Sequence, residues 1–310
     1  MCNSAYWRRT SGAATGRGRA HRAVAVTATG SRHRLLIITN LAPALLLAAW
    51  TGAARGQIAT RLAPYRDSIP STLVTFEMIP IPGGTVTLDS PAGPRAVAVA
   101  PFWIGKTEVT WDEYDVWVYR LDVAAAAAAP GGGDSADATA RPSRPYGVPD
   151  RGFGHHGYPA LAMTYTAAQG YCAWLSARTG RHYGLPTDAQ WTRALAAGLG
   201  GDTSLSAERR DALAWYAGNA ANQAHAVATK HADALGVHDL LGNVAEWVTV
   251  PDGPPVVRGG SWVDPAARVG PHARAAQTPA WNETDPQFPK SRWWLADAPF
   301  VGFRIVLLTP

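Results

Sequence analysis

Short apolar runs, broken by proline and glycine, mark the chain from about residue 75 onward. Residues 78–86 (MIPIPGGTV) are mostly apolar and contain a Gly-Gly pair that is typical of a turn. A second apolar run follows at residues 96–104. Because short runs bounded by turn residues are typical of strands, the pattern predicts strand and turn structure at 78–86 and a further strand at 96–104.

Three helices are predicted where apolar residues at helical spacing coincide with capping signals. The first begins at Thr110, with Glu113 three residues later, as in a capping box that satisfies two free backbone N–H groups. The second spans residues 164–178 and ends before Gly180, a residue typical of helix ends. The third begins at Thr187, again with a glutamine three residues later.

The rest of the chain shows little periodicity. Residues 124–149 contain an alanine run and three consecutive glycines without apolar spacing, and we interpret them as a low-complexity surface insertion. Residues 216–310 are rich in glycine, proline and tryptophan and carry only short β-like runs. Strands, then helices, then an irregular region predict an α+β fold in a domain at 75–308, preceded by a linker at 57–74.

Charge changes the picture mainly at the N-terminus. The 310 residues include 28 Lys and Arg against 23 Asp and Glu, but eight arginines lie in residues 1–56, which contain no acidic residue. Without this basic leader the net charge falls from +5 to −3, so no nucleic-acid partner is expected.

The leader also contains an apolar run at residues 35–50, followed by small residues. The run is shorter than the roughly 20 residues that a bilayer-spanning helix needs, and the pattern predicts a signal peptide cleaved before Gln57. We therefore expect a periplasmic or extracellular protein. An uncleaved leader that holds the protein at a membrane is the alternative.

Eight short motifs occur in order over roughly residues 75–308. They are 78–84 (MIPIPGG), 106–110 (KTEVT), 157–160 (GYPA), 171–175 (YCAWL), 185–187 (LPT), 241–247 (LGNVAEW), 258–262 (RGGSW) and 302–304 (GFR). In this order they resemble the formylglycine-generating enzyme family, also called the sulfatase-modifying-factor domain. The resemblance implies a modified C-type-lectin fold, consistent with the α+β layout, but not by itself the family's reaction.

The resemblance does not extend to the residues of that reaction. The family's oxidases use molecular oxygen and a copper ion, held by two cysteines shortly after the Gly-Gly-Ser motif, to convert a sulfatase cysteine to formylglycine. The matching positions here are Asp264 and Val269, and neither supplies the thiolate that copper(I) prefers. Of the chain's two cysteines, Cys2 belongs to the leader and Cys172 to the apolar face of the second helix. We therefore expect no copper.

The family's calcium site matches this sequence better than its copper site does. In relatives, calcium is bound around the Gly-Asn-x-x-Glu-Trp motif by a side chain, two backbone carbonyls and a glutamate. The matching residues are Asp239, Gly242, Val244 and Glu246. Such oxygen ligands suit a hard cation that tolerates irregular geometry. The alternative is that Asp239 closes a turn and Glu246 pairs with an arginine. Asn219 matches a ligand of a second family calcium site whose acidic loop we do not find in this sequence.

The same resemblance implies a cleft beneath the segment that contains Ser261, Trp262 and Asp264. Our leading hypothesis is an exported protein that binds a peptide, a glycan or a cell-envelope protein there, without thiol chemistry. One alternative is an oxidase, either formylglycine-generating or independent of cysteine, as the family's pyoverdine-maturation branch suggests; Asp264 would then be the candidate base. The other alternative is a cell-envelope scaffold.

Tryptophan and histidine residues complete the candidate chemistry. Four tryptophans can stack on a ligand or pack the core, and we favour the core; they are Trp262, Trp281, Trp293 and Trp294. We interpret the neighbouring His155 and His156 as solvated surface residues rather than metal ligands, because adjacent side chains of an extended segment point in opposite directions.

Overall fold

The computed structural model describes residues 62–89, 93–123, 141–143, 147–201, 204–251 and 253–308. The chain divides into two units, Met1–Gln57 and Ile58–Pro310, and all described residues belong to the second. The predicted signal peptide and most of the predicted insertion lie outside the described residues. Within the described part, no helix is long and apolar enough to cross a membrane.

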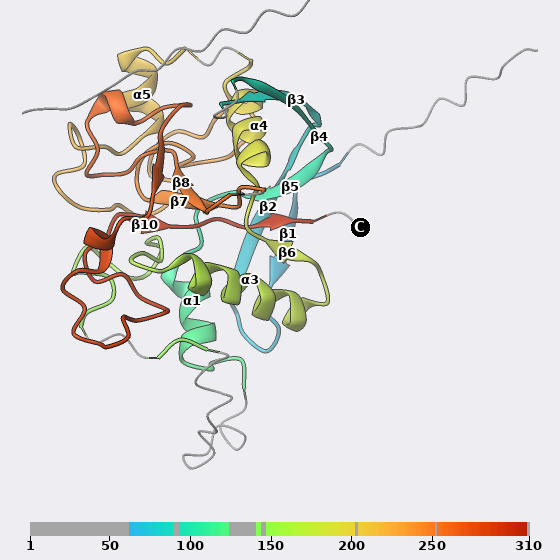
Figure 1. The fold of residues 1–310 in the computed structure, drawn as a ribbon. Helices are drawn as coiled ribbons and strands as arrows, with labels where there is room; N and C mark the ends of the chain where they lie inside the picture. Colours follow the sequence, from blue (N-terminus) through green and yellow to red (C-terminus); the bar gives the residue numbers. More distant parts are fainter. Residues whose placement is uncertain are drawn as a thin grey trace, which may run out of the picture. The chain divides into compact units, whose positions relative to one another are not determined.

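An antiparallel sheet of five strands, in the order β1-β2-β5-β11-β6, forms the centre of the second unit (Figure 1). The strands span Tyr65–Ser68 (β1), Thr75–Ile81 (β2), Phe102–Gly105 (β5), Val306–Leu307 (β11) and Tyr183–Gly184 (β6). β1 lies within the segment 57–74 that the sequence assigns to a linker. The sheet therefore begins earlier than expected, because β1 pairs with β2 along its whole length.

Two smaller sheets accompany the central one. β3 (Gly84–Leu88) and β4 (Arg95–Val99) form a hairpin. A four-stranded sheet has the order β10 (Val301–Gly302), β7 (Ala245–Val248), β8 (Val256–Arg258) and β9 (Arg274–Ala276). The single strand predicted at 96–104 is wrong, because the run divides at Pro101 into β4 and β5, which join different sheets. Proline has no N–H to donate, so a continuous ladder is disfavoured at this point.

The three predicted helices are confirmed as α1 (Trp111–Val118), α3 (Tyr165–Thr179) and α4 (Asp188–Gly198). At the start of α1, the N–H and the hydroxyl of Thr110 donate to Oε1 of Glu113 at 3.1 and 3.0 Å. α3 ends at Gly180, whose φ of 71° lies in the left-handed region that favours glycine. A further helix, α5 (Ala207–Leu213), has a serine cap but buries no side chain fully, so apolar spacing does not reveal it.

Two hydrophobic cores lie on opposite faces of the central sheet. In β2, Phe76 and Met78 join a core with the buried faces of α1 and α3, whereas Ile79 and Ile81 join a core with α4. This division follows from the strand itself, since successive side chains point to opposite faces. Figure 1 accordingly places α1 and α3 on one side of the sheet and α4 on the other.

Candidate functional site

A cleft of about 870 Å³ opens along residues 263–275, directly after the Gly-Gly-Ser-Trp motif. Its lining comes from β8, β9, α5 and the short 3₁₀ helix η1 (Ala266–Arg268). Trp281 and Phe300 add an aromatic wall, with ring centroids 5.5 Å apart in an edge-to-face arrangement. The structure therefore has a cavity beside Asp264, one of the three predicted cleft residues.

Two consecutive glycines let the chain turn from β8 into this cleft. Gly259 and Gly260 have φ values of 89° and 74°, a region that favours glycine. A Cβ on Gly259 would lie 2.6 Å from the carbonyl oxygen of Leu240, and one on Gly260 would lie 2.5 Å from that of Arg268. The motif is thus required both by the backbone conformation and by close contact with two neighbouring segments.

The three predicted cleft residues have different positions. Ser261 is fully buried, and its N–H and Oγ donate to Oδ2 of Asp264 at 2.9 and 2.7 Å. Trp262 is 8% exposed, donates from Nε1 to the carbonyl of Pro299 and packs edge-on against Phe153. Only Asp264 lines the cleft. Ser261 therefore orients the aspartate from behind, and Trp262 is a core residue, as are Trp293 and Trp294.

Basic side chains dominate the charge of the cleft. Its lining contains Arg210, Arg268, Arg274 and His272 but only one carboxylate, Asp264. Arg268 is exposed and makes no side-chain hydrogen bond or ion pair with any described residue. The sequence interpretation missed this feature, although residues 268–274 (RVGPHAR) contain three basic side chains in seven positions.

Two further carboxylates stand beside the cleft: Asp89, whose Oδ2 lies 3.9 Å from Nδ1 of His272, and Asp188, which is shared by two arginines. Asp188, the first residue of α4, lies 3.4 Å from Nε of Arg274 and 3.4 Å from Nε of Arg258. Arg258 is buried, and it also donates to the carbonyl of Pro271 at 2.7 Å. This arrangement fixes the segment that carries Arg274 to the rim while leaving the positive charge in excess.

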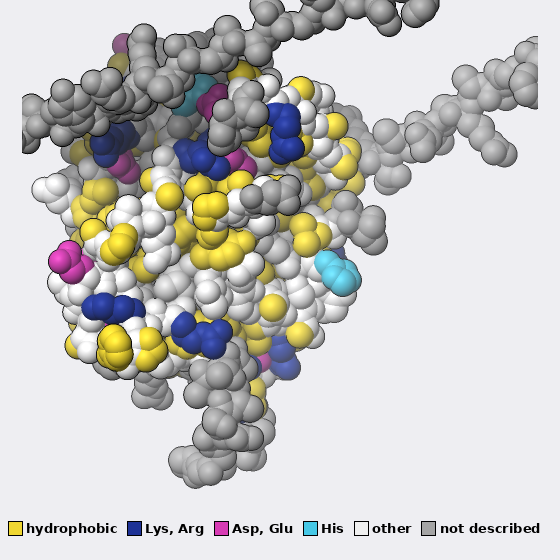
Figure 2. Space-filling view, in the orientation of Figure 1, with side chains coloured by type: hydrophobic (Ala, Val, Ile, Leu, Met, Phe, Trp, Pro, Cys, Tyr) yellow, Lys and Arg dark blue, Asp and Glu magenta, His cyan; other side chains and the backbone are white. Residues whose placement is uncertain are grey.

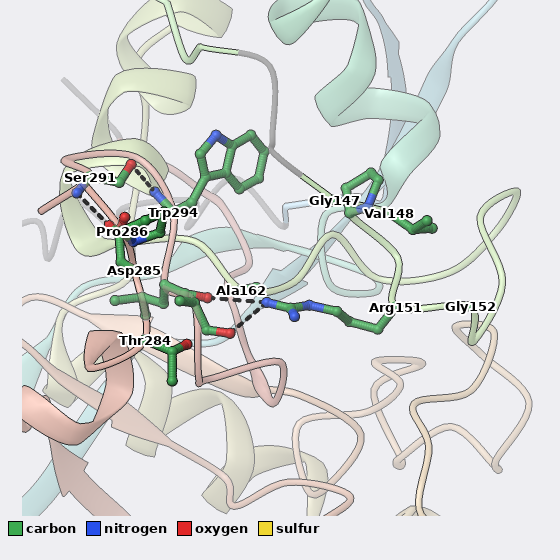
Figure 3. A pocket seen from close by; sticks show the side chains of 13 residues that line it. Gly147, Val148, Arg151, Gly152, Ala162, Thr284, Asp285, Pro286, Ser291 and Trp294 are labelled. Carbon is green, nitrogen blue, oxygen red and sulfur yellow. Dashed lines mark hydrogen bonds between the residues drawn. The ribbon is translucent and has the colours of Figure 1, made fainter.

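A second cavity, of about 520 Å³, offers less for recognition (Figure 3). Its charged side chains are already engaged by the protein. Arg151 donates to the carbonyls of Ala296 and Leu295 at 2.7 and 3.5 Å. The carboxylate of Asp285 accepts from the side chain of Asn282 and from the backbone N–H of Gln287 and of Ser291. The cleft with the free arginine is therefore the better candidate site.

The predicted calcium residues lie in a fully buried polar cluster. Glu246 accepts from Nε and Nη2 of Arg304 at 2.9 and 2.6 Å, and its other oxygen accepts from Nε1 of Trp191 at 2.9 Å. Arg304 also donates to the carbonyls of Gly105 and His238. The cluster thus ties β7, α4 and the C-terminal segment together, and it engages both carboxylate oxygens of Glu246.

Two other carboxylates in this cluster have an oxygen without a partner. Asp239 accepts from the N–H of Ala228 through Oδ2, whereas its Oδ1 is buried without a hydrogen bond. The same holds for Oε2 of Glu108, a residue the sequence interpretation missed because nothing local marks it as buried. Burial, and then the charge of Asp239, raise the pKa of Glu108 well above its ordinary value. Burial raises the pKa of Asp239 to about 6.

The unpaired oxygens of Asp239 and Glu108 are better placed to bind a hard cation than those of Glu246, which already accept hydrogen bonds. Three carboxylates face one guanidinium, and calcium prefers oxygen ligands from carboxylates and backbone carbonyls. Among the described residues, no group of three or more His, Cys, Asp or Glu side chains is arranged to hold a metal ion. The predicted calcium site therefore stays a prediction, in which Asp239 and Glu108 each have an oxygen without a hydrogen-bond partner and Glu246 has none.

The remaining predicted residues have structural partners. Asn219 closes a turn, since it accepts from the N–H of Tyr216 and donates to the carbonyl of Ala214. Gly242 has a φ of 75°, and a Cβ there would lie 2.2 Å from the carbonyl oxygen of Trp215. Cys172 is buried in α3, where burial raises the pKa of its thiol. It does not line the cleft.

Comparison with known proteins identifies the family. The sequence model of the sulfatase-modifying factor enzyme 1-like domain matches residues 67–307. Among solved structures, Treponema denticola variable protein 1 is similar with 19% identity, a TM-score of 0.58 and coverage of 79% of this chain and 99% of that one. PvdO from Pseudomonas aeruginosa is similar with 20% identity, a TM-score of 0.53 and coverage of 78% and 98%. Since the family model covers most of the chain, the protein belongs to the sulfatase-modifying factor enzyme 1-like family.

Proposed function

We propose that this protein is an exported member of its family that binds a partner in the cleft at residues 263–275 and carries out no thiol-dependent oxidation. The observation that carries the proposal is the cleft itself, about 870 Å³ with an aromatic wall and an arginine that has no partner among the described residues. Concave sites with apolar walls and a few uncommitted polar groups are typical of ligand binding.

The absence of thiol chemistry is supported by the residues at the two positions that match the family's cysteines. Asp264 lines the cleft, whereas Val269 lies behind its wall, 1% exposed and packed in a hydrophobic core. Val269 offers only an apolar side chain, and Asp264 accepts two hydrogen bonds from Ser261. Cys172 is buried in the core with a raised pKa, and a thiol in that state is a poor nucleophile and a poor metal ligand.

Binding in the cleft is tested by filling it. Ala275, on the exposed strand β9, lines the cleft, and Ala275→Trp would occupy it without disturbing a core. Ala96→Trp, at an exposed position of β4, is the matched control because Ala96 does not line this cleft. The protein is cross-linked in envelope extracts of its own source cells, and the amount of cross-linked partner is quantified.

We expect the parent and Ala96→Trp to give the same specific cross-linked species and Ala275→Trp to reduce it at least about tenfold. Equal recovery by all three proteins would contradict binding in the cleft, because the partner would then contact another surface. Circular dichroism of the three proteins checks that each is folded.

Export and calcium binding belong to the same proposal. Cleavage before Gln57 follows from the leader's composition and is tested by mass spectrometry of the protein purified from its source. An intact segment 35–50 in that protein would contradict a cleaved signal peptide. A calcium ion at Asp239 would compensate the excess of buried carboxylates, and extracytoplasmic compartments supply the ion.

A further inference from the structure

We propose that the ligand of the cleft is an extended acidic peptide segment, whose carboxylates pair with Arg268 and Arg274 and whose backbone adds to the free edge of β9. This inference rests on the proposed binding function and specifies the chemistry of the partner. Three independent features of the described residues lead to it: charge, a free strand edge and the shape of the apolar wall.

The first feature is uncompensated positive charge. Arg268 has no partner among the described residues, and Arg274 shares the single carboxylate of Asp188 with Arg258. The lining contains three arginines and one carboxylate, Asp264, while Asp89 and Asp188 lie beside it. Figure 2 shows Lys and Arg side chains on the upper part of the molecule with Asp and Glu side chains beside them, and further Lys and Arg side chains on the lower part.

Such a group of guanidinium ions selects anionic ligands. The planar guanidinium donates two parallel hydrogen bonds to a carboxylate, so a carboxylate ligand is favoured both by charge attraction and by hydrogen-bond geometry. Residues 57–310 as a whole carry a net charge of −3. The arginines that line the cleft are therefore a local feature, opposite in sign to the net charge of this segment.

The second feature distinguishes a peptide from other anions. β9 lies at the end of its sheet and pairs with β8 alone, through Val256↔Ala276 to Arg258↔Arg274. All three residues of β9 are exposed, and Arg274 and Ala275 line the cleft. A free strand edge offers backbone N–H and C=O groups at the spacing of another extended chain, and peptides are often bound in this way. A sulfated or carboxylated glycan has no matching repeat of donors and acceptors.

The third feature, the apolar wall of the cleft, indicates which kind of side chain lies between the acidic residues of the ligand. Trp281, Phe300 and Val257 line the cleft, and the small side chains of Ala273 and Ala275 leave room beside β9. An apolar side chain of the ligand would bury against the aromatic pair, while neighbouring acidic residues reach the arginines at the rim. The cleft therefore favours a short extended segment in which acidic residues flank an apolar one.

Three labelled peptides test the proposal by fluorescence anisotropy. The probe is a seven-residue peptide with alternating glutamates and a central phenylalanine. The second peptide replaces each glutamate with glutamine, which removes the charge at nearly constant shape. The third keeps the glutamates but carries N-methyl groups on alternate backbone nitrogens, which blocks pairing with a strand edge.

We expect the glutamate peptide to bind at least about tenfold more tightly than either control peptide, with affinity that falls as salt is added. Arg268→Gln should weaken its binding severalfold without affecting folding, since Arg268 has no structural partner among the described residues. Arg95→Gln, an exposed arginine of β4 outside the cleft, is the matched control and should change nothing.

Three outcomes would overturn the proposal. Equal affinity for the glutamate and glutamine peptides, blocked by Ala275→Trp, would leave binding in the cleft intact but refute the preference for acid. Complete displacement of the glutamate peptide by a short heparin fragment at equal charge concentration, with no effect of N-methylation, would indicate a sulfated glycan. Binding of the glutamate peptide that Arg268→Gln and Ala275→Trp both leave unchanged would place it outside the cleft and count against the proposed function as well.

Discussion

At the scale of single residues, the most informative feature is the imbalance of charge in the buried cluster around Arg304. Glu108, Asp239 and Glu246 are all nearly inaccessible to solvent, and a single guanidinium serves them. Buried carboxylates without a cation or a proton are costly. The raised pKa values of Glu108 and Asp239 indicate that protonation relieves the cost when no cation is bound.

A substitution at Asp239 tests whether a bound cation or a bound proton neutralises the buried carboxylates. Asp239→Asn keeps an oxygen that accepts from the N–H of Ala228 but removes one charge. In EDTA at neutral pH we expect the variant to be at least as stable as the parent, because repulsion among the carboxylates decreases. In calcium at about 100 times its Kd the parent should gain about 2.7 kcal/mol, a rise in Tm of about 5 °C or more, and the variant much less.

The measurement is thermal unfolding of both proteins in EDTA and in calcium. Magnesium at the same concentration is the control ion, because it is smaller and demands near-ideal octahedral geometry. A Tm of the parent that is identical in EDTA and calcium would show that no calcium ion stabilises the fold.

Glu113 gives a second prediction at this scale. Burial raises its pKa to about 7, although its hydrogen bonds with Thr110 oppose the shift. A carboxyl whose pKa is raised by folding stabilises the protein fully below its unfolded pKa, about 4.5, and this contribution is lost as pH rises through about 7. The contribution corresponds to about 3 kcal/mol, as an order of magnitude.

Glu113→Gln removes this titration while keeping the cap. α4 demonstrates that glutamine suffices, since Oε1 of Gln190 accepts from the N–H and the hydroxyl of Thr187 at 2.9 and 3.1 Å. Urea unfolding of parent and variant at pH 5 and pH 7.5 is the measurement. We expect the free energy of unfolding of the parent to fall relative to the variant between these pH values; parallel behaviour would refute the prediction.

At the scale of elements, the loop before α3 is tied to α1 by a histidine between two carboxylates. Nδ1 of His155 lies 2.9 Å from Oδ2 of Asp150, and Nε2 lies 2.8 Å from Oδ2 of Asp115 on α1. The ring also stacks on Trp111. Burial acts to lower the pKa of His155, but the two carboxylates outweigh it, and the pKa is raised. The sequence interpretation, a solvated histidine, did not detect this role because both partners are distant or in the loop itself.

The histidine makes the attachment of this loop dependent on pH. Because folding raises the pKa of His155, its contribution is complete below the ordinary value of about 6.5 and is lost as pH rises through the folded-state pKa. His155→Gln should therefore speed amide exchange in residues 150–157 severalfold at pH 6 and much less at pH 9. His182→Gln, at an exposed histidine outside this loop, is the control. Equal effects of His155→Gln at both pH values would contradict the prediction.

The sequence predicts the helices, whose signals are local, and misses the strand pairing, which depends on residues far apart in the chain. The helices were predictable because the caps at Thr110 and Thr187 and the stop at Gly180 are encoded within a few residues. The strand order was not, because β6, β10 and β11 have two residues each and pair with partners that are far away in the chain. The sequence predicted one strand in place of β4 and β5 because the apolar run continues on both sides of Pro101.

At the scale of the whole molecule, the family motifs assemble the centre of the fold, and the residues outside them shape the cleft. Glu246 and Arg304 come from two motifs and meet in the buried cluster. Asp264 could be placed at the cleft from the resemblance, whereas the positive charge around it depends on Arg210 of α5 and on Arg268 and Arg274, which lie outside the motifs. Membership in the family therefore accounts for the scaffold, and the proposed function rests on the lining of the cleft.

The most direct test of this account is an assay for the family's oxidation. The purified protein, loaded with copper and supplied with oxygen, is incubated with a cysteine-containing sulfatase peptide, and the product is examined for an aldehyde by mass spectrometry. A family member that has both cysteines, assayed in parallel, confirms that the peptide and conditions are competent. We expect no aldehyde from this protein, because Asp264 and Val269 occupy the positions that match the family's cysteines and its one described cysteine is buried elsewhere. Formation of formylglycine at a rate comparable to that of the control enzyme would contradict the central claim.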